Sequence, residues 1–475
     1  GPPAPVEVSA PMPRELVTIQ VGQCGNQVGK AFWLRVLAEH ARQSAGIYDE
    51  ALSSFFRNVD ARFEPASELP LGSPLSSLRA RALLIDMEEG PVSEMLRSDI
   101  GELFDSAQSI TDVSGSGNNF AHGFGYYGPR YGAEILEQAR RALEECDSPQ
   151  SFLLLHSLGG GTGSGLGSFV LGALEDAFPE IYRLDCCVMP SAEDDVVTSP
   201  YNALLGLREL GEHADAVLPL ENGALAGIVE RYGSPDADKA QGFARMNDLA
   251  GRVISDLTSS MRFPGDLNVD LNEVTTNLVP FPRMQFLMCS LSPFGSKAAP
   301  KGRRRAPGGR DVAVQRPRSI REIFQDVLQP YHQLVQEDIR ASRMLACGLF
   351  ARGPITISDF NLHVKGLQKQ LRFPYWNVEG FKVGQCSVPS MDSPQSLLCL
   401  SNSCAIRHPL QRMRDRFDTL WKRKAMVHHY DQYMDRESFL HAATSVDDII
   451  QRYGDMERGA SDQAMPEIPL FKAAF

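Results

Sequence analysis

The chain has 475 residues, which is too long for a single hydrophobic core, and this length indicates two to four domains. Its hydrophobic content of 43% and charged content of 22% are ordinary for a folded protein. The formal net charge of −12 argues against a nucleic-acid partner, because neutralising phosphates requires a basic surface.

The first 13 residues are rich in proline and lack the basic start and apolar centre of a signal peptide, so we expect residues 1–13 to form a disordered extension. The nine cysteines include no C-x-x-C pair. The spacing typical of zinc and thioredoxin-like sites is therefore missing, and a reducing compartment fits best. No apolar run reaches the roughly 18 residues that a membrane span requires.

Short apolar runs alternate with helical patterns through the first half of the chain. The predicted strands are residues 16–21, 82–85, 152–155, 186–189 and 216–220. Such alternation predicts a parallel sheet with helices on both faces.

The second half has a mixed pattern. We expect a helical connector over 222–250 with a loop at 233–239, strands at 286–290, 344–350 and 397–400, a mobile loop at 296–318, and helices from residue 408.

The strongest single feature is the glycine-rich run Gly159–Gly165, which lies between a predicted strand and an amphipathic helix. Glycines let several backbone N–H groups approach one anion, and the start of a helix adds a partial positive charge. Thr162 and Ser164 add hydroxyl donors. The run matches neither G-x-G-x-x-G nor G-x-x-x-x-G-K-[ST], so it predicts a phosphate site of another kind, with an ordinary turn as the alternative.

Two more glycine-containing turns, 22–27 and 114–119, follow predicted apolar segments. Each is weak evidence by itself. Because the carboxyl ends of parallel strands meet at one edge of a sheet, we expect all three turns to converge on one ligand crevice.

These segments, together with Arg262–Gly265 and Val279–Arg283, resemble the tubulin family in letters and in order, from about Met12 to about Asp455. The resemblance implies an α/β fold with a parallel Rossmann-type GTP-binding sheet, a core helix, a mixed α/β second domain and a C-terminal helical hairpin. After the extension at 1–13, it implies a GTP-binding domain at 14–222, a core helix and intermediate domain at 223–403, and a C-terminal helical domain at 404–475.

The resemblance also implies GTP or GDP with magnesium as ligands. Residues carried over for the base and phosphates are Gln23, Cys24, Gln27, Asn118, Ser157, Gly160, Gly161, Thr162 and Gly163. For ribose and guanine they are Asp195, Asn222 and Asn247, with Phe243 in place of a base-stacking Tyr. Glu88 would face the magnesium through water.

Two positions depart from the family pattern. Ser199 stands where a Glu commonly contacts the ribose, so we expect that contact to be lost. Gly115 replaces an acidic residue three positions before Asn118, so we expect magnesium to be held less firmly.

In tubulins, the segment matching residues 266–273 faces the nucleotide of the next subunit. Alpha-type chains have Glu at the position of Glu273, and beta-type chains have Lys. A carboxylate there can orient or deprotonate the water that attacks the terminal phosphate. The resemblance thus implies that Glu273 acts in trans and that GTPase activity needs assembly; a plain surface glutamate is the alternative.

Within the family, Gly46–Val59, Leu78–Ala82 and Ala192–Asn202 resemble the epsilon type. This implies a cytoplasmic, cytoskeletal protein of centrioles, centrosomes and the basal bodies of cilia, which supports doublet and triplet microtubules. The implied partners are other tubulins, through longitudinal and lateral contacts, and centriolar proteins, with no nucleic acid and no membrane. The alternatives are a GTP-bound adaptor that caps or bridges centriolar tubulin without hydrolysis, and a metabolic α/β enzyme with a nucleotide cofactor.

Two surface segments set this chain apart from common tubulins. The segment 296–318 matches the family's lateral-contact loop but is longer and basic, which predicts attraction to acidic tubulin surfaces or a solvated loop. The end of the sequence, 467–475, has no polyacidic run, so we expect enzymes and motors that read acidic tails to find little there.

Overall fold

The structure is a computed structural model, and it describes residues 14–43, 45–63, 66–191, 194–232, 242–265, 267–294, 304–305, 311–312, 318–377 and 380–459. The expected extension at 1–13, the loop at 233–239, most of the basic segment 296–318 and the end at 467–475 lie outside these residues. No helix among the described residues combines the length and apolar content needed to cross a membrane.

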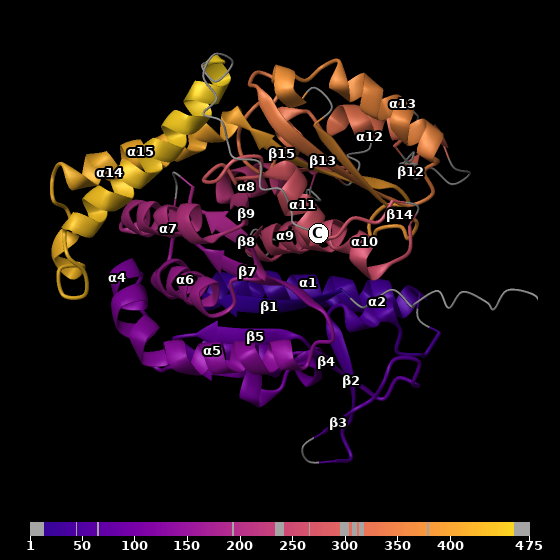
Figure 1. The fold of residues 1–475 in the computed structure, drawn as a ribbon, viewed down its shortest axis with the longest axis horizontal. Helices are drawn as coiled ribbons and strands as arrows, with labels where there is room; N and C mark the ends of the chain where they lie inside the picture. The colour runs from indigo at the N-terminus through magenta and orange to yellow at the C-terminus, as the bar shows by residue number, and fades with distance from the viewer. Residues whose placement is uncertain are drawn as a thin grey trace, which may run out of the picture.

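A six-stranded parallel sheet forms the first half of the molecule (Figure 1). Its order is β6-β5-β1-β7-β8-β9, and every neighbouring pair is parallel. The strands are β1 (Glu15–Val21), β5 (Ala82–Asp86), β6 (Ser109–Thr111), β7 (Pro149–Ser157), β8 (Tyr182–Met189) and β9 (Ala216–Glu221). The five predicted strands and their parallel arrangement are confirmed, and β6 adds a sixth that is too short to carry a periodic signal.

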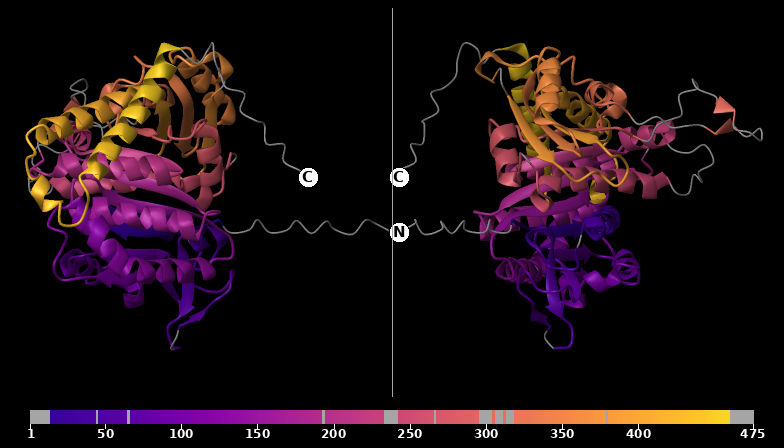
Figure 2. Two further views of the ribbon diagram at one scale, coloured as in Figure 1. Left: turned by 60° about the vertical axis from the view of Figure 1, so that its left-hand side comes forward. Right: turned by 90° about the vertical axis from the view of Figure 1, so that its right-hand side faces the viewer.

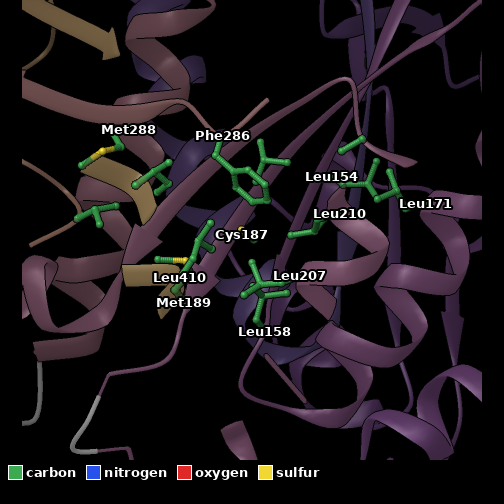
Figure 3. Close-up of a cluster of buried hydrophobic side chains, with 14 of the residues drawn as sticks. Leu154, Leu158, Leu171, Cys187, Met189, Leu207, Leu210, Phe286, Met288 and Leu410 are labelled. Carbon is green, nitrogen blue, oxygen red and sulfur yellow. The ribbon is translucent and has the colours of Figure 1, made fainter. Parts of the chain in front are cut away.

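Helices cover both faces of this sheet because its central strands are apolar on both sides. On one face lie α1 (Gly22–Gln43), α3 (Glu89–Leu96), α8 (Asn222–Tyr232) and α9 (Gly242–Leu257), whose apolar residues pack in one buried cluster. On the other face lie α5 (Gly128–Glu144), α6 (Gly167–Ala177) and α7 (Ser199–His213), together with α4 (Phe120–His122). Figure 3 shows part of that second cluster, in which Leu154 and Leu158 meet Leu207 and Leu210.

A second, four-stranded sheet carries the later part of the chain, in the order β10-β15-β13-β14. Its strands are β10 (Met288–Ser292), β13 (Met344–Arg352), β14 (Phe381–Cys386) and β15 (Ser396–Ser403), and only β13 and β14 are parallel. The associated helices are α10 (Ser259–Arg262), α11 (Leu271–Leu278), α12 (Ile320–Asp326) and α13 (Ile357–Gln368). The three predicted strands are present, with β10 displaced two residues towards the C-terminus.

The C-terminal helices α14 (Arg407–Trp421) and α15 (Glu437–Arg458) form a hairpin on the outside of the molecule, against α7 (Figure 2). Tyr201 of α7 packs edge-on against Phe417, Tyr430 and Phe439. The short helix η9 (Val427–His429) lies between the two long helices. These aromatic contacts fasten the hairpin to the first half of the molecule.

A small three-stranded sheet extends from the first half (Figure 1). It consists of β2 (Phe56–Asp60), β3 (Ser67–Glu68) and β4 (Ser77–Ala80), and it follows α2 (Glu50–Ser53). An antiparallel pair of two-residue strands, β11 (Arg304–Arg305) and β12 (Asp311–Val312), lies within the basic segment.

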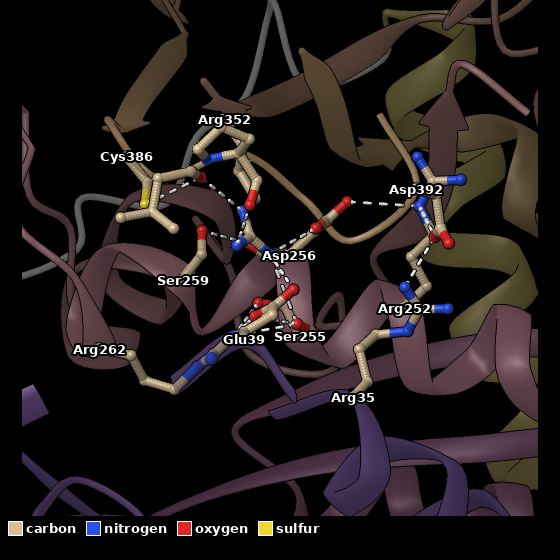
Figure 4. A network of polar contacts seen from close by, with 12 residues as sticks. Arg35, Glu39, Arg252, Ser255, Asp256, Ser259, Arg262, Arg352, Cys386 and Asp392 are labelled. Atoms are coloured by element: carbon tan, nitrogen blue, oxygen red, sulfur yellow. Dashed lines mark hydrogen bonds and ion pairs between the residues drawn. The ribbon is translucent and has the colours of Figure 1, made fainter. Parts of the chain in front are cut away.

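Buried charges join the two halves of the molecule (Figure 4). Glu39 of α1 binds Arg262 at 2.8 Å and Arg352 of β13 at 2.8 Å, and Arg352 also binds Asp256 of α9 at 2.9 Å. Burial alone would raise the pKa of Glu39, but the two arginines outweigh it and hold that pKa at about 2. These side chains are almost fully buried, so each charge depends on its partners.

Candidate nucleotide-binding site

The three glycine-containing turns meet at the carboxyl edge of the parallel sheet, as predicted. They enclose a cavity of about 210 Å³. Its lining includes many of the residues expected to contact phosphate or metal: Gln23, Cys24, Glu88, Asn118, Ser157, Gly160, Gly161, Thr162 and Gly163.

The glycine-rich run turns directly into the short π-helix η4 (Thr162–Leu166), which continues as α6. A Cβ on Gly161 would lie 2.4 Å from the backbone nitrogen of Asn119 and 2.6 Å from Oγ of Ser116. The hydroxyls of Ser116 and Thr162 lie 2.8 Å apart and connect two of the turns. Because the first N–H groups of a helix have no acceptor within the helix, this junction offers donors to an anion.

The turn at 22–27 is held against the glycine-rich run. Gly22 has φ +76°, and a Cβ there would lie 3.0 Å from the backbone nitrogen of Gly163. Asn26 donates through Nδ2 to the carbonyls of Gly22 and Ile85, at 3.0 and 3.2 Å. The side chains of Gln23 and Cys24 thus reach the cavity from a fixed backbone.

Asn202, a residue that was not among the predicted site residues, fixes the turn at 114–119 against the glycine-rich run. Its Nδ2 donates to the backbone carbonyls of Asn118 at 2.8 Å and Gly159 at 2.9 Å. Asn118 has φ +52°, which its short polar side chain tolerates. The segment Pro200-Tyr201-Asn202 was visible in the sequence, but the role of Asn202 depends on its contacts with two distant turns.

Two acidic residues at the end of β5 form the polar side of the cavity. Asp86 is 3% exposed, and its Oδ2 has no hydrogen-bond partner among the described residues. Burial, with a smaller contribution from Glu88, raises the pKa of Asp86 to about 7. Gly115 has φ +63°, and a Cβ there would lie 2.5 Å from Oε1 of Glu88. Magnesium prefers oxygen ligands, so this pair of carboxylates fits it, although only Glu88 was predicted.

The residues expected around the base occupy two neighbouring cavities. Gln27 and Asn247 line a cavity of about 570 Å³ between α1 and α9, and Nδ2 of Asn247 donates to Oε1 of Gln27 at 3.3 Å. Asn222 lines another of about 640 Å³. Phe243 lines both, and its 68% exposure leaves the ring available for stacking.

Two positions in and just before α7 differ from expectation. Asp195 is exposed and lines none of the three cavities, whereas its neighbour Asp194 lines the cavity of Asn222. Ser199 is 1% exposed and belongs to α7, whose N-cap is Thr198 without a side-chain cap bond. A serine followed by proline is typical of an N-cap and the first helical residue, but the cap here is Thr198, so the helix begins one residue earlier than this pattern predicts.

Glu273 lies apart from these cavities, in the first turn of α11. Asp270 caps this helix by accepting the N–H of Glu273 at 2.7 Å. The Glu273 carboxylate lies 2.5 Å from Nζ of Lys382 on β14, and its side chain is 45% exposed. Glu273 therefore has no place in the chain's own cavity and remains open to a neighbouring molecule.

Comparison with known proteins supplies the family. Residues 15–230 match the Tubulin/FtsZ family, GTPase domain, and residues 282–415 match the tubulin C-terminal domain. The chain is similar to the tubulin epsilon chain of Mus musculus, with 43% identity, and to that of Homo sapiens, with 42% identity. Each alignment spans 484 residues, covering 96% of this chain and 99% of the relative. The resemblance to the epsilon type is thereby confirmed. The glycine-lined cavity lies within the matched GTPase domain, whose ligand class is guanine nucleotide. The chain belongs to the tubulin family.

Proposed function

We propose that this epsilon-type tubulin is a structural component of centrioles and basal bodies, where it supports doublet and triplet microtubules. The proposal places it in the cytoplasmic cytoskeleton, with other tubulins and centriolar proteins as partners. It divides the chain at 14–222, 223–403 and 404–475, after an extension at 1–13. The observation that carries the nucleotide part is the convergence of three glycine-containing turns on one cavity.

In this proposal the phosphates of GTP or GDP lie in that cavity, on the backbone of residues 160–163. Ser157 and Asn118 add polar contacts, and the first turn contributes Gln23 and Cys24. The base stacks on Phe243 beside Gln27 and Asn247, and the ribose lies near Asn222, with Asp195 reaching it from its loop. Hydrogen bonds from the backbone to phosphate oxygens are charge-assisted and therefore strong.

Asp86 and Glu88 would hold magnesium, Glu88 through water. When bound, the ion neutralises phosphate charge. The unpartnered Oδ2 of Asp86 supports this assignment, because a buried carboxylate oxygen without a donor fits a cation. Glycine at position 115 leaves room for the Glu88 carboxylate, because a Cβ there would lie 2.5 Å from its Oε1.

Hydrolysis in this proposal depends on assembly. Glu273 cannot reach its own chain's nucleotide, so it would orient the attacking water in the site of a longitudinal neighbour. Lys382 sets the direction of the carboxylate from within the same chain. A lone subunit would then bind GTP and turn it over very slowly.

The ion pair with Lys382 also favours a second candidate. If Glu273 remains paired after assembly, its carboxylate is unavailable to water, and the protein is a GTP-bound adaptor that caps or bridges centriolar tubulin without hydrolysis. The two candidates share the nucleotide site and differ only in what Glu273 does.

Identifying the bound nucleotide tests the shared part. The purified full chain is denatured, and the released small molecules are separated by anion-exchange chromatography against GTP, GDP and NAD standards. We expect GTP or GDP at close to one per chain. A chain that carries no guanine nucleotide and ignores added GTP with magnesium would refute the proposal.

Mixed assembly with alpha- and beta-type tubulin separates the two candidates. Glu273→Ala should slow phosphate release in the assembled state about 100-fold if Glu273 activates water in trans. Glu134→Ala, an exposed glutamate of α5 that lines none of the three cavities, is the matched control and should have no effect. Equal rates for Glu273→Ala and the wild type would instead favour the adaptor.

A further inference from the structure

Directly beneath the glycine-rich run lies a buried charged pair that none of the proposed nucleotide contacts uses. His156 is the penultimate residue of β7 and is 1% exposed. Its Nε2 lies 2.7 Å from Oδ2 of Asp185 on the adjacent strand β8, and both side chains are fully buried. Its neighbours Leu154 and Leu158 belong to the apolar cluster of Figure 3. A charged pair in such surroundings is costly unless it is fully hydrogen-bonded.

The other ring nitrogen of His156 holds the glycine-rich run itself. Nδ1 lies 2.8 Å from the backbone carbonyl oxygen of Gly163, which lines the phosphate cavity. A Cβ on Gly167 would lie 3.1 Å from this same Nδ1, so the glycine leaves room for the ring. The run is thus anchored from the side opposite to the cavity.

The chemistry of the two partners fixes the state of the ring. A carbonyl oxygen and a carboxylate can only accept hydrogen bonds, so both ring nitrogens must donate, which requires the doubly protonated imidazolium. Burial alone would lower the pKa of His156, but Asp185 outweighs it and the pKa is raised. Both hydrogen bonds are therefore charge-assisted.

We propose that His156 and Asp185 are positioning residues for the phosphate site, and that the doubly protonated ring locks the glycine-rich run in its nucleotide-binding conformation. The inference rests on the proposed nucleotide site and adds the device that holds it. Neutralising the ring leaves one nitrogen without a proton. Either Gly163 or Asp185 then faces a lone pair, and the run loses its anchor.

Few other groups can interfere with this titration. Of the described side chains that interact with the pair, the titratable ones are Cys186 and Cys187 on β8, and burial raises the pKa of both thiols so that they stay neutral. The segment formed by η4 and α6 faces the ring with Gly163 and Gly167. The protonation of His156 is therefore governed by Asp185.

Three substitutions distinguish the two hydrogen bonds. In His156→Gln, the amide nitrogen replaces Nε2 and the bond to Gly163 is lost. In His156→Asn, it replaces Nδ1 and that bond is kept. In Asp185→Asn, a neutral imidazole can donate to Gly163 while accepting from the new amide. Glu15→Gln is the control, because it breaks an equally buried ion pair, with Arg81, at the opposite end of the same sheet.

The measurement is the dissociation rate of a fluorescent GDP analogue from the full chain, at pH 7 to compare variants and from pH 8 to 10, above the titration of Asp86, for the pH dependence. We expect the wild type to release it faster as pH rises, and His156→Gln to release it about tenfold faster at pH 7, equivalent to about 1.4 kcal/mol. His156→Asn should remain near the wild-type rate at pH 7, and Asp185→Asn should release at a rate independent of pH. Glu15→Gln should follow the wild type.

Two results would overturn the inference: a wild-type rate that does not change with pH, or a His156→Gln rate no faster than that of Glu15→Gln. Both presuppose that the wild type binds the analogue. Failure of the wild type to bind it would instead count against the nucleotide site itself. The pH dependence of the wild type needs no substitution, so the test holds even if a variant does not fold.

Discussion

At single positions around the phosphate cavity, backbone atoms approach so closely that no side chain fits. Gly161 is the clearest case, with its pro-Cβ position 2.4 Å from one backbone atom and 2.6 Å from a hydroxyl. Its neighbour Gly160 is less confined, with nothing nearer than 3.7 Å. The requirement for glycine is therefore specific to the position at which the second and third turns touch.

Gly161→Ala should weaken GTP binding at least tenfold, because the methyl group must push the turn of Asn119 away from the cavity. Gly366→Ala in α13 is the matched control, since nothing lies within 4 Å of its added Cβ. Equilibrium titration with a fluorescent GTP analogue measures both. Equal affinities of the two variants would show that the tight contact does not shape the site.

Asp86→Asn should raise the magnesium concentration needed for half-maximal GTP binding about tenfold, because an amide is a poorer ligand for a hard cation than a carboxylate. Glu89→Gln, one residue beyond Glu88 and outside the cavity lining, serves as the control. GTP affinity is measured over a magnesium titration. If Asp86→Asn retains the wild-type magnesium midpoint, the buried carboxylate has no role in holding the ion.

Among the helices, α6 and α7 are joined by a histidine held between two carboxylates. His213, near the end of α7, places Nδ1 2.6 Å from Glu175 of α6 and Nε2 3.3 Å from Glu209 of its own helix. The hydrogen bond to Glu209, together with that to Glu175, outweighs burial and raises the pKa of His213 to about 9. Both ring nitrogens are engaged, so this cluster works as an ion-pair clamp between helices.

The clamp predicts a loss of stability in alkaline solution. His213 binds its proton more tightly in the folded state, so its contribution is complete below the unfolded pKa of about 6.5 and disappears as pH rises through about 9. We expect His213→Gln to lower stability by roughly 1–2 kcal/mol at pH 6, after allowing for partial exposure, and to have little effect at pH 10. Denaturant unfolding at the two pH values checks this, with the exposed His408→Gln as control. An equal loss at both values would contradict it.

For the molecule as a whole, the buried network of Figure 4 joins the helix that starts at the nucleotide cavity to the second sheet. Glu39 lies near the end of α1, whose first residues line the cavity, and it binds Arg352 of β13. Arg35, on the same helix, binds Asp248 of α9 and Asp392, each at 2.7 Å. The helix that borders the cavity is therefore tied by ion pairs to α9 and to the second sheet.

Glu39→Gln should destabilise the protein by about 3 kcal/mol, because it leaves two buried guanidinium groups without their shared carboxylate. Glu94→Gln removes only an exposed partner of Lys30 and should change stability by less than about 1 kcal/mol. Thermal unfolding measures both. A midpoint for Glu39→Gln that matches that of Glu94→Gln would mean that the arginines find other partners.

Much of the fold could be predicted from local pattern, but short elements could not. Strands β1, β7 and β8 are long, apolar and followed by helices, so the alternation of strands and helices was visible in the sequence. By contrast, β6 has three residues and β3 has two, which is too few for any periodicity. The first three residues of β14 are half-buried, so this strand has no continuous apolar run that would have predicted it.

The sequence by itself determined the chemistry of the phosphate cavity, because a dense glycine run between a strand and a helix has few other uses. The resemblance to tubulins further implied that Glu273 acts on a neighbour's site, which remains a prediction. Only the tertiary structure decided which distant groups complete the site: Asp86 from β5, Asn202 from α7, and the pair of His156 and Asp185 beneath the run. The reason is physical, since a polar side chain in a sequence carries no sign of its partner until folding removes water and forces each buried donor to find an acceptor.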